Sequence, residues 1–297
     1  MNLLGSLRKE KPKFTGSMTA LITPFDNGEL DLNSFRNIVK HQIDNGTAGL
    51  IPVGTTGESP TLSHYEHEKI VEVCIEESSG KVSVIAGAGS NSTSEACALA
   101  SHAGKAGADA VLVVTPYYNK PTQSGLYSHF MSVADAAKVP VIVYDIPGRS
   151  IIPVHDSTLV KLCENHELIS GIKDATADIS RPPRLLRLIG DGFSQLSGED
   201  ATALPYLSAG GHGCISVSSN IAPKLLSQMH NAWRNKDLQK SFEIHLQMIN
   251  LHDAMFCESS PGPVKFAAEK LGLCKSEGRL PIVEIEDFSK KQVINAL

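Results

Sequence analysis

The 297-residue chain lacks the features that mark several classes of protein. It has one tryptophan and only 5% aromatic residues, and no apolar run approaches the length of a membrane span. Its formal net charge is −5, so it has no basic surplus of the kind that nucleic-acid-binding proteins use. We therefore expect neither a membrane nor a nucleic acid as partner. The 41% of hydrophobic and 20% of charged residues are ordinary for a soluble globular protein.

The cysteines show no Cys-x-x-Cys pair. There are six of them, all isolated in the sequence: Cys74, Cys97, Cys163, Cys214, Cys257 and Cys274. Most lie in apolar periodic segments, which predicts free buried thiols in a reducing cytoplasm. Residues 1–13 lack the apolar core and the small-residue cleavage site of a secretory signal. We expect these residues to form a mobile, solvated extension of a cytoplasmic protein.

Nucleotide-binding motifs are also missing. Residues 87–92 read Gly-Ala-Gly-Ser-Asn-Ser, which lacks the third glycine of the dinucleotide fingerprint, and no Gly-Lys-Ser/Thr phosphate loop occurs. An open, doubly wound sheet is the main alternative architecture, and it would usually carry such a loop early in the chain. The absence favours a closed barrel over that alternative.

Eight short apolar segments alternate with amphipathic, helix-forming segments along most of the chain. The apolar segments are residues 18–22, 49–53, 82–86, 110–114, 141–144, 169–173, 194–196 and 214–217. Eight strands that are apolar on both faces and alternate with helices predict a (β/α)8 TIM barrel. We place the barrel at residues 14–236. A small C-terminal helical domain is predicted at residues 237–297, where helical periodicity continues without strands.

Three helix starts carry local signals. The patterns Ser63-x-x-Glu66 and Ser92-x-x-Glu95 both predict capping boxes. The Pro182-Pro183 pair suits the first turn of a helix.

Because chemistry in such barrels lies at the C-terminal ends of the strands, the residues at those ends are the candidates for a site. The sixth strand ends on Lys173. A lysine there loses hydration, which favours the neutral, nucleophilic amine that imine chemistry on a carbonyl substrate needs. The alternative is a lysine whose ammonium reaches solvent from the strand end. Gly171 is expected to leave space beside it.

Two polar residues follow the fifth strand. Tyr144 ends this strand, where it can act as a general acid or base, and Arg149 can clamp a carboxylate in bidentate fashion. The alternatives are a core tyrosine with a satisfied hydroxyl and a surface arginine.

Two loops after other strands add hydroxyls and backbone N–H groups. Residues 54–59 read Gly-Thr-Thr-Gly-Glu-Ser, in which Thr55 and Thr56 lie between glycines that allow a carboxylate-binding nest or a plain turn. After the fourth strand, adjacent Tyr117 and Tyr118 cannot both face one pocket. Either one of them reaches a neighbouring chain, or both pack on their loop.

His64 and His67 share one helix face at i, i+3 spacing. The order His-Glu-x-x-His is absent and no third ligand is evident, so we predict no metal site. These histidines either lie on the surface or bind a ligand at a crevice.

Taken together, the motifs resemble the dihydrodipicolinate synthase family of pyruvate-dependent class I aldolases and lyases. The motifs that carry the resemblance are residues 54–58 (Gly-Thr-Thr-Gly-Glu), residues 115–119 (Thr-Pro-Tyr-Tyr-Asn), Tyr144-x-x-Pro147-x-Arg149, and residues 171–174 (Gly-Ile-Lys-Asp). The resemblance covers nearly the whole chain after the first dozen residues. It implies a 4-hydroxy-tetrahydrodipicolinate synthase activity in the diaminopimelate and lysine pathway, with pyruvate and L-aspartate 4-semialdehyde as substrates.

The resemblance also implies roles for individual residues. Lys173 would form the imine with pyruvate. Tyr144, Thr55 and Tyr118 would relay protons, with Tyr118 crossing into a neighbouring subunit of a homo-oligomer, most often a dimer of dimers. Thr56, Gly198 and Ile215 would help to bind pyruvate, and Arg149 would bind the carboxylate of the second substrate. No metal or organic cofactor is implied, because the protonated imine is itself the electron sink.

A feedback site for L-lysine is implied as well. Its positions here are Pro60, His64, His67, Gly89, Asn91, Glu95 and Tyr117. Two residues depart from the family pattern, Pro60 in place of a small residue and Asp145 in place of the common asparagine. The alternatives in function are another Schiff-base lyase, of the N-acetylneuraminate, keto-deoxy-sugar acid or 4-hydroxy-2-oxoglutarate type, and a non-catalytic sensor of pyruvate or lysine.

Overall fold

Eight parallel strands close into a barrel in the order β1, β10, β9, β8, β7, β6, β5 and β4 in the computed structural model, which describes residues 10–297. The strands are β1 (Gly16–Ala20), β4 (Gly49–Ile51), β5 (Ser83–Gly87), β6 (Ala110–Val114), β7 (Val141–Asp145), β8 (Ile169–Asp174), β9 (Ser194–Ser197) and β10 (Gly213–Ser216). The predicted (β/α)8 barrel is confirmed, and each predicted strand lies within two residues of the observed one. Most of the predicted extension at residues 1–13 lies outside the described residues.

Helices follow the strands as the sequence predicts. They are α1 (Leu32–Asp44), α2 (His64–Ser78), α3 (Thr93–Ala106), α4 (Gln123–Ala137), α5 (Pro147–Ser150), α6 (Asp156–Asn165), α7 (Arg181–Leu188), α8 (Ala203–Ser208), α9 (Pro223–Arg234), α10 (Leu238–Ala254), α11 (Gly262–Lys270) and α12 (Asp287–Ala296). Five short elements were not predicted: α5, the strands β2 (Phe25–Asp26) and β3 (Glu29–Leu30), which form a hairpin, and the 3-10 helices η1 (Ser59–Thr61) and η2 (Ser218–Asn220). Elements of two to four residues are too short to show a periodicity.

The two predicted capping boxes differ in outcome. At α2, the Ser63 side chain accepts from the Glu66 N–H while the Glu66 carboxylate accepts from the Ser63 N–H, so this box is confirmed. At α3, Ser92 makes no side-chain cap, and the Glu95 carboxylate accepts instead from the Ser90 hydroxyl. The second box is therefore wrong, because the Ser90 hydroxyl binds the Glu95 carboxylate and also accepts the Ser92 N–H that the box would have used. The two prolines at the start of α7 are confirmed.

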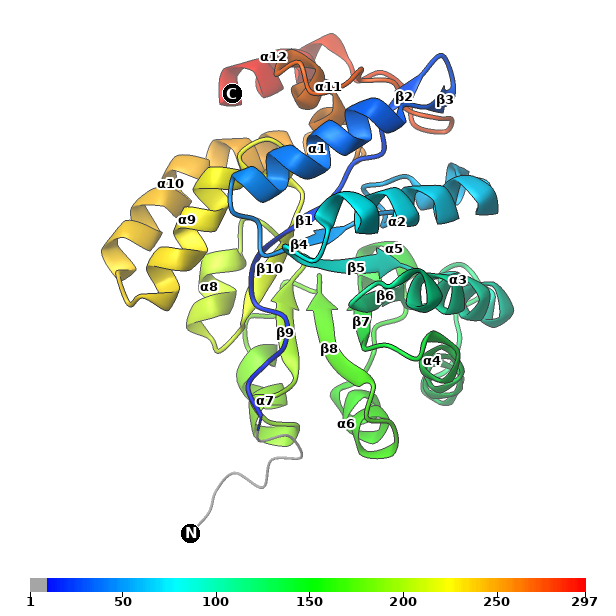
Figure 1. Cartoon of the computed structure of the whole chain (residues 1–297). Coiled ribbons are helices and arrows are strands. Elements are labelled where there is room, and N and C mark those ends of the chain that lie inside the picture. The colour runs from blue at the N-terminus through cyan, green and yellow to red at the C-terminus, as the bar shows by residue number, and fades with distance from the viewer. Residues whose placement is uncertain (1–9) are drawn as a thin grey trace. The chain divides into compact units, whose positions relative to one another are not determined.

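The chain divides into two compact units. The central unit comprises the described residues up to Thr15 together with Ile85–Ile215, and the split unit comprises Gly16–Val84 with Ser216–Leu297. In the central unit, β6, β7, β8 and β9 run side by side in parallel, α3 packs on α4, and α4 packs on α6 (Figure 1).

In the split unit, β1 pairs with β4, α1 packs on α2, and α9 packs on α10. Helices α10, α11 and α12 occupy the region predicted to be a C-terminal helical domain, and α12 contacts both other helices. The predicted boundary at residue 236 falls between α9 and α10, and its standing as a domain boundary stays a prediction.

The strands are buried because helices cover them. Every residue of β7 is buried, and so is every residue of β9 and β10. Parallel strands of this kind read as continuous apolar runs, which is why they could be recognised in the sequence. All six cysteines are free thiols, as predicted, but only Cys74 and Cys214 are buried, and the other four are partly exposed.

Candidate active site

Lys173 and Tyr144 meet at the C-terminal ends of two paired strands of the central unit. In the parallel pair of β7 and β8, Tyr144 is in register with Lys173, and Asp145 with Asp174. Both Lys173 and Tyr144 are 6% exposed, and the Lys173 Nζ lies 4.2 Å from the centre of the Tyr144 ring. The structure thus brings together the two residues predicted to carry imine formation and proton transfer, in a setting that excludes most solvent.

Gly171 has a different role from the one expected. A side chain at this position would place its Cβ 2.5 Å from the Ser194 carbonyl oxygen and 2.9 Å from Cδ1 of Ile142. Its missing side chain therefore allows the neighbouring strands to approach closely. It does not leave open space beside Lys173.

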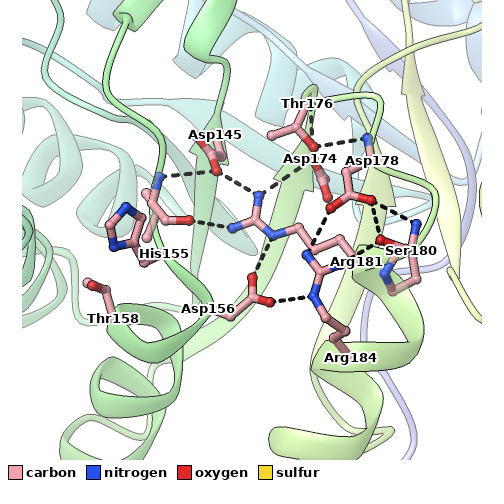
Figure 2. Close-up of polar contacts among 12 residues, drawn as sticks. Asp145, His155, Asp156, Thr158, Asp174, Thr176, Asp178, Ser180, Arg181 and Arg184 are labelled. Carbon is pink, nitrogen blue, oxygen red and sulfur yellow. Dashed lines mark hydrogen bonds and ion pairs between the residues drawn. The ribbon is translucent and has the colours of Figure 1, made fainter.

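Asp145 and Asp174, the residues that follow Tyr144 and Lys173, both lie against a buried arginine, Arg181. The Arg181 cluster consists of Arg181 and three carboxylates, those of Asp145, Asp156 and Asp174 (Figure 2). The Arg181 guanidinium donates to Asp145 Oδ2 at 2.7 Å, to Asp156 Oδ1 at 3.0 Å and to the Val154 carbonyl at 2.6 Å, and it lies 3.7 Å from Asp174 Oδ1.

The cluster is buried, and some of its carboxylate oxygens have no hydrogen-bond partner among residues 10–297. Asp145, Asp174 and Arg181 are all nearly inaccessible to solvent. Burial raises the pKa of the Asp145 carboxyl, and Arg181 opposes that shift. Among residues 10–297, Asp145 Oδ1 and Asp174 Oδ2 find no hydrogen-bond partner. Asp145, the residue that departs from the family pattern, therefore has its charge paired with Arg181.

Glu199 is a candidate that the sequence analysis missed. It follows Gly198 just after β9, and burial and the neighbouring Asp200 raise the pKa of its carboxyl, while Lys173 and Arg149 lower it. Glu199 is thus an acid whose charge interacts with both Lys173 and Arg149. The available signal was an acidic residue directly after a strand end, where barrel enzymes carry their chemistry.

The other predicted substrate-binding residues of the central unit, Arg149, Gly198 and Ile215, differ in how far they are exposed to solvent. Arg149 lies in α5 and is exposed. Gly198 donates its N–H to the Asp174 carbonyl at 2.7 Å, and Ile215 is fully buried in β10.

The predicted carboxylate nest lies in the split unit, in the Thr55 turn, which we define as residues 54–58. The turn is closed by the N–H groups of Gly57 and Ser59, which donate to the Gly54 carbonyl, and by the Glu58 N–H, which donates to the Thr55 carbonyl. Thr56 is buried and Thr55 is half-buried. The N–H groups of Thr55 and Thr56 are not among these donors, and backbone N–H groups of this kind are suited to an anion.

Part of the predicted lysine site gathers in the central unit. Tyr117 is half-buried, and burial together with the nearby Glu95 raises the pKa of its hydroxyl, while a hydrogen bond with the Asn91 backbone lowers it. A side chain at Gly89 would lie 2.5 Å from the Val114 nitrogen. Tyr118, the next residue after Tyr117, is 87% exposed with φ of 71°, so the two tyrosines point to different surroundings.

The other members of the predicted lysine site lie in the split unit. Pro60 lies in η1 (Ser59–Thr61) and is exposed, while His64 and His67 lie in the first two turns of α2. His64 is exposed and His67 is buried, although they share one face of the helix.

Residues 10–297 contain no group of three or more histidine, cysteine, aspartate or glutamate side chains that could hold a metal ion. None of the helices in this part of the chain combines the length and the apolar character that crossing a bilayer requires.

The barrel and its buried lysine–tyrosine pair are those expected of a Schiff-base lyase, and comparison with known proteins defines the class. The model of the dihydrodipicolinate synthetase family matches residues 13–297. The 4-hydroxy-tetrahydrodipicolinate synthase of Bradyrhizobium diazoefficiens is 54% identical over 287 residues, which are 97% of either chain.

Solved structures agree with this relationship. The chloride-inhibited dihydrodipicolinate synthase of Acinetobacter baumannii, complexed with pyruvate, is 40% identical with a TM-score of 0.92 over 95% of this chain and 97% of that one. The lysine-bound dihydrodipicolinate synthase of Cyanidioschyzon merolae is 37% identical with a TM-score of 0.93 over 96% and 98%.

The chain therefore belongs to the dihydrodipicolinate synthetase family. The predicted resemblance is confirmed, and so is the prediction of a lyase, because relatives at this level of identity bear the name of the activity that the motifs implied.

Proposed function

We propose that the protein condenses pyruvate, held as a Schiff base on Lys173, with L-aspartate 4-semialdehyde to give 4-hydroxy-tetrahydrodipicolinate. The observation that carries this proposal is the buried Lys173, whose Nζ lies 4.2 Å from the centre of the Tyr144 ring at the paired ends of β7 and β8. Membership of the dihydrodipicolinate synthetase family supports the choice of substrates.

The reaction begins when the neutral Lys173 amine attacks the carbonyl carbon of pyruvate and water leaves, which forms a protonated imine. This imine withdraws electrons, so a proton is lost from the pyruvate methyl group and an enamine forms. The enamine carbon attacks the aldehyde carbon of the second substrate. The amino group of the adduct then attacks the imine carbon, closes the ring and releases Lys173. Tyr144, Thr55 and Tyr118 move the protons in these steps.

The remaining residues bind and orient the two substrates. The Thr55 turn, with Thr56, receives the pyruvate carboxylate on backbone N–H groups, and Gly198 and Ile215 line the pyruvate pocket. The exposed guanidinium of Arg149 suits the carboxylate of the incoming aldehyde, which arrives from solvent.

Borohydride trapping tests the proposal directly. Pyruvate and borohydride together should inactivate the enzyme and add the reduced pyruvyl group to the peptide that contains Lys173. A label on another lysine, or no label, would reject the mechanism. Assays that offer pyruvate with either L-aspartate 4-semialdehyde or N-acetylmannosamine separate this activity from that of a sugar-acid lyase.

We further propose that the protein works as a cytoplasmic homo-oligomer, most simply a dimer of dimers. The side chain of Tyr118 supports this, because it is 87% exposed and held at a positive φ. A tyrosine that completes the proton relay of a partner subunit must extend its side chain away from its own subunit. Sedimentation analysis of the wild type measures the oligomeric state.

We also propose that L-lysine inhibits the enzyme. Support comes from the grouping of Asn91, Glu95 and Tyr117, in which the Glu95 carboxylate suits an amino group. Titration of the activity with L-lysine is the test, and an unchanged rate at millimolar lysine would contradict it.

A further inference from the structure

The backbone of the Thr55 turn is strained at both of its ends. Val53, just before the turn, has φ of 50°, and Glu58 at its end has φ of 55°. Side chains disfavour this left-handed region, and a β-branched residue such as valine disfavours it most. Such a conformation persists only where the surroundings hold it.

A buried lysine from the C-terminal region holds this turn. Lys265 lies in α11 and is fully buried. Its Nζ donates to Glu58 Oε1 at 2.5 Å and to the Thr23 carbonyl at 2.9 Å. The same Nζ lies 4.3 Å from the centre of the Phe25 ring, so carbonyl, carboxylate and ring surround the ammonium.

Further contacts tie the same residues to the turn. The Thr23 hydroxyl donates to the Gly57 carbonyl at 2.7 Å. Thr23, whose carbonyl binds Lys265, is therefore also bonded to the backbone of the turn. The second carboxylate oxygen of Glu58 accepts from the Arg279 N–H at 2.9 Å. Both oxygens of Glu58 are therefore bound by residues that lie beyond position 260 in the chain.

Stability alone does not require an ammonium at this place. Burial lowers the pKa of Lys265 and the Glu58 carboxylate opposes this, so the charge is kept at a cost in desolvation. A well-packed apolar side chain often replaces a buried ion pair without loss of stability. What an apolar side chain cannot do is orient Glu58 and the Thr23 carbonyl at the same time.

We propose that Lys265 is a positioning residue for substrate binding, which fixes the backbone N–H groups of the Thr55 turn through Glu58 and Thr23. The C-terminal helices thereby take part in the recognition of the pyruvate carboxylate. This inference rests on the proposed function, because it assigns that carboxylate to the turn.

Lys265→Met tests the role, with Lys270→Met as its matched control. Lys270 lies in the same helix, and its side chain is 45% exposed. Loss of one charge-assisted contact to the turn should raise the KM for pyruvate about tenfold in Lys265→Met, and should leave it unchanged in Lys270→Met. The KM for the aldehyde and the trapping of Lys173 at saturating pyruvate should change little.

A double variant separates positioning from stability. Lys265→Met leaves the Glu58 carboxylate buried without its cation, whereas Lys265→Met/Glu58→Gln removes both charges. The double variant should recover thermal stability while the KM for pyruvate stays raised. Recovery of both quantities together would show that Lys265 is only structural and would overturn the proposal.

If Lys265→Met does not fold, as judged by circular dichroism, Thr23→Val carries the test. It keeps the shape of a buried side chain and the ion pair, and it removes only the hydrogen bond to the Gly57 carbonyl. The KM for pyruvate should again rise, and an unchanged value would overturn the proposal. Failure of the proposed function is distinguishable, because the wild type itself would then not be trapped by pyruvate and borohydride.

Discussion

In each unit of the molecule a structural cation is buried beside a predicted functional segment, and the two cations, Arg181 and Lys265, are neutralised differently. In the central unit, Arg181 meets three carboxylates, two of which are almost fully buried. In the split unit, the ammonium of Lys265 meets one carboxylate, that of Glu58, and one carbonyl. In the first arrangement three carboxylates surround one guanidinium, and one of them, Asp156, is also bound by Arg184, whereas the second is a one-to-one ion pair.

The chemistry of the two cations explains this difference. The planar fork of an arginine can bind several oxygens in fixed directions, so it joins two paired strand ends and the loop near Val154. A lysine is a compact point charge that suits one carboxylate and one carbonyl. Removal of Arg181 should therefore mainly cost stability, whereas removal of Lys265 should mainly affect the turn that it holds.

The largest effect is expected at the residue that forms the covalent bond with the substrate. Lys173→Ala should keep the fold and lower kcat by roughly 10⁴- to 10⁶-fold, because no other group supplies the imine nitrogen. Lys161→Ala is the matched control, since Lys161 is an exposed lysine of the same unit. Steady-state kinetics with circular dichroism measure both quantities. Substantial turnover in Lys173→Ala would reject the covalent mechanism.

Arg181→Met should cause the largest loss of stability. It leaves buried carboxylates without a counterion, which destabilises proteins by about 3–5 kcal/mol. Arg184→Met is its control, because Arg184 lies one turn further along α7, also contacts Asp156 and has a side chain that is 46% exposed. The control should lose at most about 1 kcal/mol. Urea unfolding of both variants at one protein concentration measures their free energies of unfolding. Equal losses would contradict the stabilising role assigned to Arg181.

The loss in Arg181→Met should depend on pH through Asp145. The folded-state pKa of this carboxyl is already raised by burial, and it rises further when Arg181 is absent. A group with a raised pKa contributes stability below its unfolded pKa and loses that contribution as the pH rises through the folded value. The loss should therefore be smallest in acid and grow toward neutral pH.

Asp145→Asn in the Arg181→Met background is the check on this assignment. The amide cannot ionise, so the double variant should regain about 1–3 kcal/mol at neutral pH and show a flatter dependence of stability on pH. Parallel stability curves for the single and double variants would show that Asp145 is not the group involved.

The barrel and the lysine–tyrosine pair could be predicted because both depend on local pattern. Eight apolar runs define the strands, and the parallel register then places the last residue of each strand at one end. Lys173 and Tyr144 needed no further information to be brought together.

The partners of the two buried cations could not be predicted, because nothing local marks them. Lys265 and Glu58 are 207 positions apart, and Arg181 and Asp145 are 36 apart. A lysine in a helix is normally a surface residue, so its burial depends on the packing of distant elements. Local competition also matters, as Glu95 shows by binding Ser90 in place of the predicted partner Ser92.

The smallest effect is expected for the more exposed ion pair of the split unit, between Glu66 and Arg279. Hydrogen bonds from Arg279 lower the pKa of Glu66 from 4.5 to about 2. A lowered pKa contributes stability above the unfolded value, and this is lost as the pH falls from about 4.5 toward about 2. Solvent screening limits the contribution to about 1 kcal/mol.

Glu66→Gln should therefore remove a small part of the stability loss of the wild type below about pH 4.5, while Glu68→Gln on the same helix should not. An NMR titration of the Glu66 carboxyl gives the direct measurement, and Arg279→Met should move its pKa up toward the ordinary value. If the titration curves of wild type and Arg279→Met coincide, Arg279 does not set this pKa.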